Sequence, residues 1–167
     1  MPKRLAIARH AKSSWADPDI ADHDRPLNAR GRRAATVVGR HLREAGWEPE
    51  LVLCSSATRT RETLELFGLP AATDVGIEDR LYGATAGALL ARLKRVPDGV
   101  ASVLVLAHNP GVEDLVRALV DEPDALPGKF PTGAVADLQL PMPTWRELEP
   151  GTCRLRGLLV PRQLGDA

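Results

Sequence analysis

Three short runs of consecutive apolar residues mark the chain, at positions 5–8, 51–54 and 103–107. None of them alternates apolar and polar side chains, as a strand with one solvent-facing side would. Runs of about four to eight apolar residues are typical of strands that are covered on both faces, as in the parallel sheets of α/β proteins. The sequence therefore predicts three buried, parallel strands.

Segments with one apolar face separate these runs and predict helices. We expect one helix over residues 29–45, with Asn28 as its N-cap, and another over residues 56–67. Two shorter helices are predicted at 85–96 and 112–119. The residues expected on the buried faces of the four helices are Ala34, Val38, Leu42, Ala45, Leu64, Phe67, Leu89, Leu90, Leu93, Val112, Leu115, Val116 and Leu119.

The remaining segments complete an α/β pattern. Residues 72–77, 135–140 and 154–160 predict three further strands, and the stretch 121–132, rich in Pro, Asp and Gly, predicts a long loop. Alternation of strands and helices over most of the chain is typical of an α/β fold with a mostly parallel sheet. At 167 residues, the length fits a single domain over residues 1–167.

Charge and composition narrow the choice of partners. The chain has 22 Lys and Arg residues and 22 Asp and Glu residues. Without a net positive field, we expect no binding to nucleic acid or to an anionic membrane. No apolar stretch approaches the about 20 residues of a membrane span, and the run at 5–8 is too short for a signal-peptide core, so we expect a cytoplasmic protein. Cys54 and Cys153 are expected to be reduced core residues.

Each predicted buried strand ends on polar residues that suit an anion. Arg9 and His10 follow the first run, and His108 follows the third. The second run opens into two serines, with Arg59 in the first turn of the next helix. In open sheets of this kind, ligands bind outside the carboxyl ends of the strands, so we expect these side chains to share one site.

Helix N-termini at the same edge would add to the attraction for anions. One of the serines 55–56 can cap the second helix. After the third strand, Asn109 can cap a helix that has Pro110 at its first position. Backbone N–H groups and the helix dipole both favour negative charge at such ends.

The acidic loop over residues 16–26 raises the alternative of a metal site. Calcium loops need a regular alternating spacing and a closing glutamate, and this loop lacks both. We therefore expect a solvated loop with local Asx turns, and no metal or cofactor is predicted. The titratable residues of the loop are Asp17, Asp19, Asp22, His23 and Asp24.

The spacing of residues excludes two known kinds of phosphate site, that of cysteine-based phosphatases and that of nucleotide-binding phosphate loops. The gap from Cys54 to Arg59 is one residue too short for a cysteine-based phosphatase, and the gap to Arg61 is one residue too long. The pair Gly128-Lys129 is followed by Phe130 where a phosphate loop needs Ser or Thr.

Taken together, the strand ends and several further motifs resemble the histidine phosphatase superfamily, also called phosphoglycerate-mutase-like. Within it, the chain is most similar to the small SixA-type phosphohistidine phosphatases. The resemblance implies a three-layer α/β/α fold with a mostly parallel central sheet and a metal-independent phosphatase without a cofactor. The matching segments are Arg9-His10, Arg25-Pro26-Leu27-x-x-x-Gly31, Ser55-x-x-x-Arg59-x-x-x-Thr63, Leu81-Tyr82 and His108-Asn109-Pro110-Gly111, with a weaker match at Lys129-Phe130-Pro131-Thr132-Gly133.

The resemblance also implies roles for four residues. His10 would attack the phosphorus atom and become phosphohistidine, which water then hydrolyses. A neutral imidazole suits this role because its unperturbed pKa is about 6.5. Arg9 and Arg59 would grip the phosphoryl oxygens, whose geometry matches a guanidinium fork. His108 would donate to another oxygen and stabilise the charge that develops in the transition state.

Departures from the superfamily's mutases bear on the substrate. Ala11 and Ala16 stand where mutase-type members carry Gly and Asn, and the longer insertion that presents their glutamate is replaced by Glu78-Asp79. Either residue could be a general acid or a solvated turn residue. We expect the substrate to be phosphohistidine on a protein partner. Two alternatives are a phosphatase of small phosphate esters and a phosphate-binding module without turnover.

Overall fold

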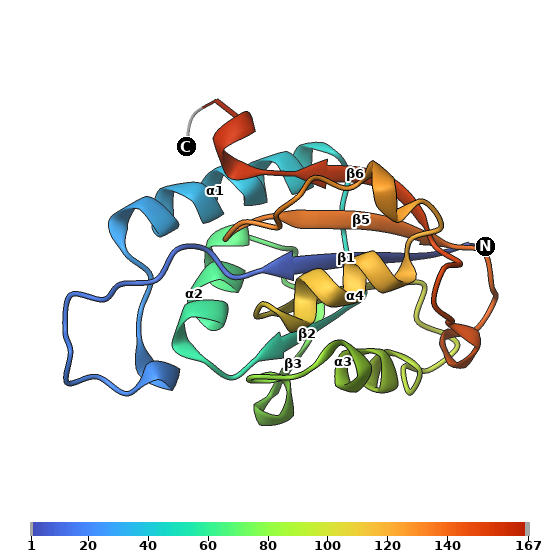
Figure 1. Ribbon diagram of the computed structural model, residues 1–167, viewed down its shortest axis with the longest axis horizontal. Coiled ribbons are helices and arrows are strands. Elements are labelled where there is room, and N and C mark those ends of the chain that lie inside the picture. Colours follow the sequence, from blue (N-terminus) through green and yellow to red (C-terminus); the bar gives the residue numbers. More distant parts are fainter. Residues whose placement is uncertain (1, 166–167) are drawn as a thin grey trace.

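A six-stranded sheet in the order β3-β2-β4-β1-β5-β6 forms the centre of the computed structural model, which describes residues 2–165 (Figure 1). The four strands β1 to β4 run parallel, and β5 is antiparallel to its neighbours β1 and β6. The prediction of a mostly parallel sheet is therefore confirmed. The strands are β1 (Lys3–Arg9), β2 (Leu51–Ser55), β3 (Asp74–Glu78), β4 (Ser102–Ala107), β5 (Val135–Leu140) and β6 (Arg154–Leu159).

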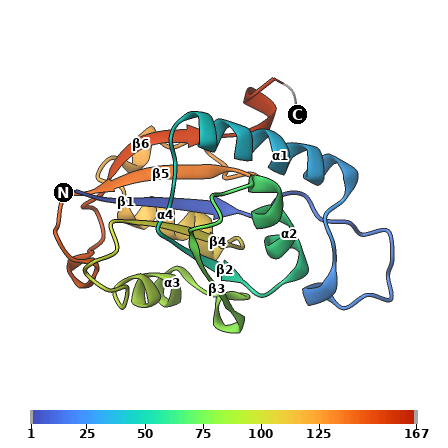
Figure 2. The same cartoon turned by 180° about the vertical axis from the view of Figure 1, so that it is seen from behind.

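Helices cover both faces of this sheet in pairs. In Figure 1 α3 and α4 lie in front of the strands, and in Figure 2, from behind, α1 and α2 lie in front. Side chains alternate along β1, so that Leu5 and Ile7 pack with α3 and α4, whereas Ala6 and Ala8 pack with α1 and α2. The fold is thus the predicted three-layer α/β/α arrangement. The helices are α1 (Ala29–Glu44), α2 (Thr58–Phe67), α3 (Ala86–Leu93) and α4 (Gly111–Leu119).

Strand register brings three carboxyl ends to the same level. Arg9 of β1 pairs with Ala107 of β4, and Cys54 of β2 pairs with Leu106 on the other side of β4. The residues that follow these pairs therefore emerge next to one another at one sheet edge. This register places the polar strand ends of the sequence in one region.

The helix boundaries differ from the predicted ones at several positions. Helix α1 ends at Glu44, so Ala45 lies outside it and is exposed, and Ala35 rather than Ala34 faces the core. The buried stripe of α1 follows the helical period through Ala35, Val38 and Leu42, and Ala34 falls beside it. Leu64 and Leu90, predicted to be buried, are half-buried at the edges of the two cores.

Of the three predicted N-caps, one is confirmed and two are wrong. The side chain of Asn28 caps α1 by accepting a 2.7 Å hydrogen bond from the N–H of Gly31. No serine caps α2, because Ala57 occupies the N-cap and makes no side-chain bond there. Pro110 rather than Asn109 is the N-cap of α4. The Asn109 side chain instead accepts from the N–H of Glu113 inside the helix.

Two further predictions concern cysteines and membranes. Cys54 and Cys153 are both buried and unpaired, as expected for reduced core residues. Burial raises the pKa of the Cys54 thiol to about 12, so this thiol does not ionise near neutral pH. Within residues 2–165, every helix is too short or too polar to cross a membrane.

Candidate active site

Two histidines lie side by side at the ends of β1 and β4. The ring centroids of His10 and His108 are 5.2 Å apart, and each residue is only 7% exposed. The backbone N–H of His10 donates to the carbonyl of Ala107, which extends the strand pairing by one residue. The structure thus brings together two of the histidines that the sequence singled out.

The His10 ring is fixed by its own backbone. Its Nδ1 atom lies 2.6 Å from the carbonyl oxygen of Ala11. Because a carbonyl oxygen can only accept, Nδ1 carries the proton and the lone pair of the neutral ring is on Nε2. The N–H of Ala11 donates in turn to Oγ1 of Thr63 at 3.0 Å, and that hydroxyl donates to the carbonyl of Arg59. Helix α2 therefore holds Ala11, the residue whose carbonyl orients the His10 ring.

His108 is held by a serine of β2. Its Nε2 atom lies 2.8 Å from Oγ of Ser55, which also accepts a 3.3 Å bond from the N–H of Ala57. This use of the Ser55 hydroxyl explains why the predicted serine cap of α2 is wrong. The neighbouring Ser56 is engaged as well, because its Oγ lies 2.9 Å from Nε2 of His23.

Arg59 faces the site from the first turn of α2 and meets an aspartate that the sequence did not place there. Its Nη1 donates to the carbonyl of Asp22 at 2.7 Å, and its Nη2 lies 3.1 Å from Oδ2 of the same residue. Tyr82 donates to Oδ2 as well, and Arg25 contacts Oδ1 at 3.2 Å. Asp22 therefore links two arginines and a tyrosine at the mouth of the site.

The solvated-loop prediction for residues 16–26 is correct at one end and wrong at the other. Asp17 forms the expected Asx turn by accepting from the N–H of Asp19. Asp22 and His23, by contrast, fold onto the site, and the His23 ring packs edge-on against Tyr82 with centroids 4.9 Å apart. Tyr82 also packs edge-on against His108 at 5.5 Å. The sequence feature that could have placed Asp22 at the site is its position three residues before the Arg25-Pro26-Leu27 motif.

Arg9 approaches the site from the other side. Its Nη1 donates to the carbonyl of Phe130 at 3.2 Å, and the same carbonyl accepts from Nδ2 of Asn109. Burial lowers the pKa of Arg9, and the negative charge of Glu113 opposes that shift. The weak motif at residues 129–133 thus borders the site through its backbone.

Burial and charge keep both histidines neutral. Desolvation lowers the pKa of His10 to about 4 and the pKa of His108 to about 3, and the positive charge of Arg59 adds to both shifts. The hydrogen bond from Tyr82, with further bonds from Arg59 and Arg25, lowers the pKa of Asp22 to about 2. At neutral pH the site therefore holds two neutral imidazoles, cationic arginines and one carboxylate.

Three nitrogens of this site are buried without a hydrogen-bond partner among the described residues: Nε of Arg9, Nε of Arg59 and Nδ1 of His108. Buried polar groups are nearly always bonded, because an unsatisfied one costs about 1–3 kcal/mol. The arginine Nε–H groups can only donate, so an oxygen-rich anion would satisfy them. The arrangement suits a tetrahedral oxyanion held near the lone pair of His10.

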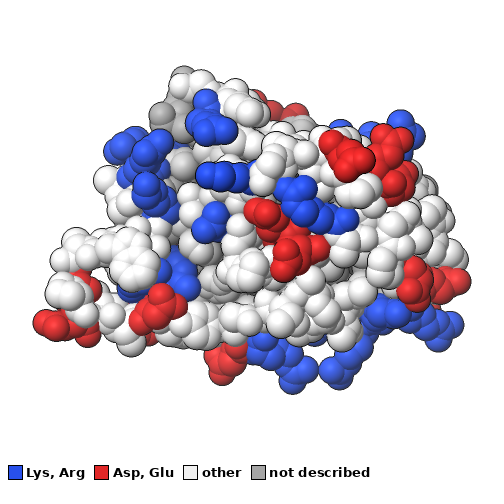
Figure 3. All heavy atoms as spheres, viewed as in Figure 1, with Lys and Arg blue, Asp and Glu red and all other residues white. Residues whose placement is uncertain are grey.

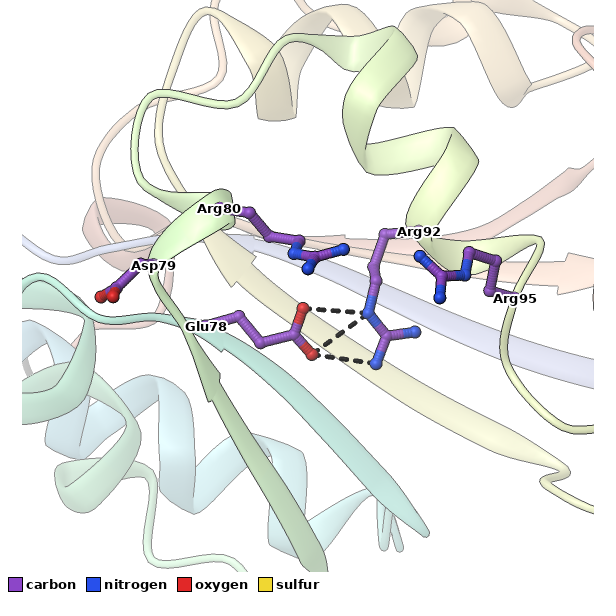
Figure 4. Close-up of a pocket in the computed structure, with 5 residues that line it drawn as sticks. All are labelled: Glu78, Asp79, Arg80, Arg92 and Arg95. Atoms are coloured by element: carbon purple, nitrogen blue, oxygen red, sulfur yellow. Dashed lines mark hydrogen bonds and ion pairs between the residues drawn. The ribbon is translucent and has the colours of Figure 1, made fainter.

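Glu78 and Asp79 belong to a different groove. Glu78 ends β3, and its carboxylate receives hydrogen bonds of 2.9 to 3.1 Å from Nε and Nη2 of Arg92 in α3 (Figure 4). Asp79 is exposed at the start of the turn that leads to Tyr82. The groove has a volume of about 640 Å³ and is lined also by Arg80 and Arg95. No described contact joins either carboxylate to the two histidines, and the general-acid role stays a prediction.

The described residues offer no metal centre. Over residues 2–165, no group of three or more His, Cys, Asp and Glu side chains is arranged to hold a metal ion. The acidic loop contributes Asp22 and His23 to hydrogen bonds with protein groups instead.

Comparisons with known proteins identify the family of this chain. A family model described as the histidine phosphatase superfamily (branch 1) matches residues 5–98. The chain is 42% identical to the uncharacterized protein Rv1276c of Mycobacterium tuberculosis, over 92% of this chain and 99% of that protein. It is 35% identical to the phosphohistidine phosphatase SixA of Escherichia coli K12, over 82% of this chain and 85% of that protein. A solved structure of the protein histidine phosphatase SixA with tungstate is similar, with a TM-score of 0.80, 28% identity, and coverage of 96% of this chain and 99% of that one.

Proposed function

Since the chain belongs to branch 1 of the histidine phosphatase superfamily, we propose that it is a phosphatase that removes the phosphoryl group from phosphohistidine on a protein partner. The similarity to SixA of Escherichia coli and to the tungstate-bound SixA supports this substrate class. Tungstate is a tetrahedral oxyanion like phosphate, and the solved relative that holds it covers nearly the whole of this chain.

Three buried nitrogens without a described partner, in Arg9, Arg59 and His108, together with the free Nε2 of His10 in the same site, carry this proposal. A binding module needs donors for phosphate, but it has no need of a neutral imidazole with a free Nε2 among them. The carbonyl of Ala11 fixes the proton of His10 on Nδ1, and burial lowers the pKa of His10 to about 4. A nucleophile is thus present in the reactive form at neutral pH.

In the proposed reaction, Nε2 of His10 attacks the phosphorus atom of the substrate. The new N–P bond forms as the P–N bond of the substrate's phosphohistidine breaks, and the departing imidazole keeps the bonding electron pair. Arg9 and Arg59 hold the phosphoryl oxygens, and Nδ1–H of His108 donates to another of them. A water molecule then attacks the phosphorus of phospho-His10, so that inorganic phosphate leaves and the imidazole is restored.

Trapping of the phosphoenzyme tests the proposal. The protein is mixed with a phosphohistidine-bearing protein labelled with ³²P and denatured rapidly in alkali, which preserves the P–N bond. We expect label on the wild type and on a His41→Asn control, whose histidine lies half-buried on α1 outside the site, and no label on His10→Asn. Label that persists on His10→Asn would overturn the assignment of the nucleophile. The same experiment in EDTA tests metal independence, which fails if labelling stops and returns with added metal.

A further inference from the structure

A small cavity of about 190 Å³ lies beside the segment that carries His10. Its walls come from four parts of the chain: the residues after β1, the first turns of α1, the segment before β5 and the turn after β6. The lining residues are Lys12, Arg30, Ala34, Pro131, Thr132, Val160, Pro161 and Arg162.

Among the described residues, the charged side chains that line this cavity are all cationic, namely Lys12, Arg30 and Arg162. None of the three has an ion pair or a side-chain hydrogen bond with another described residue. In Figure 3, blue atoms of Lys and Arg gather at the upper left of the face shown. The chain as a whole has no net charge, so this concentration is local.

The groove at Glu78 provides a contrast. It also holds three arginines, but the carboxylates of Glu78 and Asp79 line it, and Arg92 is already bonded to Glu78. An anion that entered that groove would compete with an internal ion pair. Among residues 2–165, no carboxylate lines the cavity at Lys12 and competes in this way.

The backbone fixes the cationic cavity relative to His10. The carbonyl of Lys12 accepts from the N–H of Asn28, and a Cβ on Gly31 would lie only 2.1 Å from that oxygen, so glycine lets α1 pack directly on this segment. On the other side, the N–H of Gly133 donates to the carbonyl of His10 at 2.8 Å. Because consecutive Cα atoms are about 3.8 Å apart, the Cα of Lys12 lies at most about 7.6 Å from that of His10.

We propose that Lys12, Arg30 and Arg162 form a second anion subsite, which binds a carboxylate of the same protein substrate whose phosphohistidine reacts with His10. The inference rests on the proposed function and adds a sequence preference to it. In an extended peptide each residue advances about 3.3 Å, so two or three residues cover a distance similar to that between the Cα atoms of His10 and Lys12. We therefore expect the acidic side chain two or three positions from the phosphohistidine.

Peptide kinetics test the subsite. The substrates are a phosphohistidine peptide with glutamates two and three positions from the phosphohistidine, the same peptide with glutamines, and phosphoramidate, which has no second anionic group. The variant Lys12→Gln/Arg30→Gln/Arg162→Gln is compared with Arg146→Gln, which removes one exposed arginine without a described partner far from the cavity. Binding of the unphosphorylated glutamate peptide, followed by fluorescence anisotropy, gives a readout that needs no turnover.

For the glutamate peptide, we expect the triple variant to lose about tenfold or more in kcat/KM, mainly through KM, since exposed ion pairs each contribute a few-fold. The loss on phosphoramidate should be much smaller, and the preference of the wild type for glutamate over glutamine should disappear. Equal losses on all three substrates, or no loss on the glutamate peptide, would overturn the subsite. The anisotropy measurement tests the subsite independently of the proposed function. If the wild type binds the glutamate peptide through these cations but hydrolyses no phosphohistidine, the proposed function is wrong and the subsite stands.

Discussion

Asp22 binds Arg59 through two groups, its carbonyl oxygen at 2.7 Å from Nη1 and its Oδ2 at 3.1 Å from Nη2. The two residues are 37 positions apart in the chain, and the contact joins the acidic loop to the first turn of α2. Arg59 is also a proposed ligand of the phosphoryl oxygens. An incoming phosphoryl group therefore competes with the Asp22 carboxylate for the same guanidinium.

Removal of the Asp22 charge should strengthen the binding of oxyanions. In Asp22→Asn the backbone carbonyl still accepts from Arg59, but the carboxylate that repels a phosphate dianion is gone. We expect the Kd of inorganic phosphate to fall about three- to tenfold, the effect of one nearby charge at a partly solvated site. Isothermal titration calorimetry measures it. Asp24→Asn, in the same 3-10 turn and with a mostly exposed side chain, is the control and should change little. Weaker binding in Asp22→Asn would mean that Asp22 chiefly positions Arg59.

Local sequence patterns were sufficient to predict the mostly parallel sheet and the strand ends of the site, whereas the three-layer arrangement was implied by the resemblance to the superfamily. Runs such as 103–107 have few alternatives as buried strands, and parallel strands place their carboxyl ends at one edge. The strand register then determines that His10 and His108 are neighbours. These features follow from local patterns that repeat along the chain.

The contacts of Asp22 could not be predicted in the same way. A loop with several aspartates has many conformations of similar local energy, and its choice among them depends on Arg59, Arg25 and Tyr82, which come from distant segments. The same holds for Glu78, whose bond to Arg92 depends on how α3 packs beside β3. The helix ends differ from the predicted ones by one to three residues, and α3 ends at Leu93 rather than at residue 96. At the start of α2, the two serines predicted as caps contact His23 and His108 instead.

Loss of one charge-stabilising donor should slow the reaction strongly. His108→Ala or Arg59→Ala removes a donor to the phosphoryl oxygens, and we expect kcat to fall about a hundredfold or more. Arg61→Ala is the matched control for Arg59→Ala, because Arg61 is exposed on the same helix and donates to the backbone carbonyl of Ser56. Steady-state kinetics on phosphohistidine peptide measure the effect. Losses of only two- or threefold would show that other residues build the phosphate site.

The acid limb of the pH profile should lie well below the usual pKa of histidine. Nucleophilic attack needs neutral His10, and burial lowers the pKa of this residue to about 4. As pH falls through 4, His10 gains a proton and kcat/KM should decline about tenfold per pH unit, whereas it should change little from protonation of His10 between pH 6.5 and 5. The rates are measured on a substrate with known ionisation and corrected for it, and circular dichroism checks that the fold persists. An enzyme limb near pH 6.5 would contradict the low pKa.

Thr63 should be important for stability as well as for the orientation of His10. In Thr63→Val the N–H of Ala11 loses its acceptor inside a buried segment, so we expect the free energy of unfolding to fall by about 1–3 kcal/mol. Thr36→Val is a close control, because both hydroxyls donate to the carbonyl four residues earlier in their helix, but Thr36 is exposed. Urea denaturation measures both variants. Equal effects of the two substitutions would assign the loss to the helix bond alone.

The chemistry of the leaving group should make alkyl phosphates poor substrates. An alkoxide is a poor leaving group unless an acid protonates it, whereas a phosphohistidine ring that already carries a proton departs as neutral imidazole. The carboxylate that contacts Arg59 and Tyr82 is Asp22, and the hydrogen bond from Tyr82 lowers its pKa to about 2, so it has no proton to give at pH 7. Glu78 is bonded to Arg92 in a separate groove.

We therefore expect kcat/KM for phosphohistidine peptide or phosphoramidate to exceed that for glycerol phosphate by about a hundredfold or more, the usual contribution of a general acid. The double variant Glu78→Gln/Asp79→Asn separates the remaining alternatives. If either residue is the acid, as the sequence allows, this variant should lose the residual activity on glycerol phosphate and keep that on phosphoramidate. Efficient hydrolysis of glycerol phosphate by the wild type, with none of phosphohistidine, would favour a phosphatase of small esters instead. Such an enzyme would need a proton donor for the leaving alkoxide, and the described carboxylates do not supply one in their present contacts.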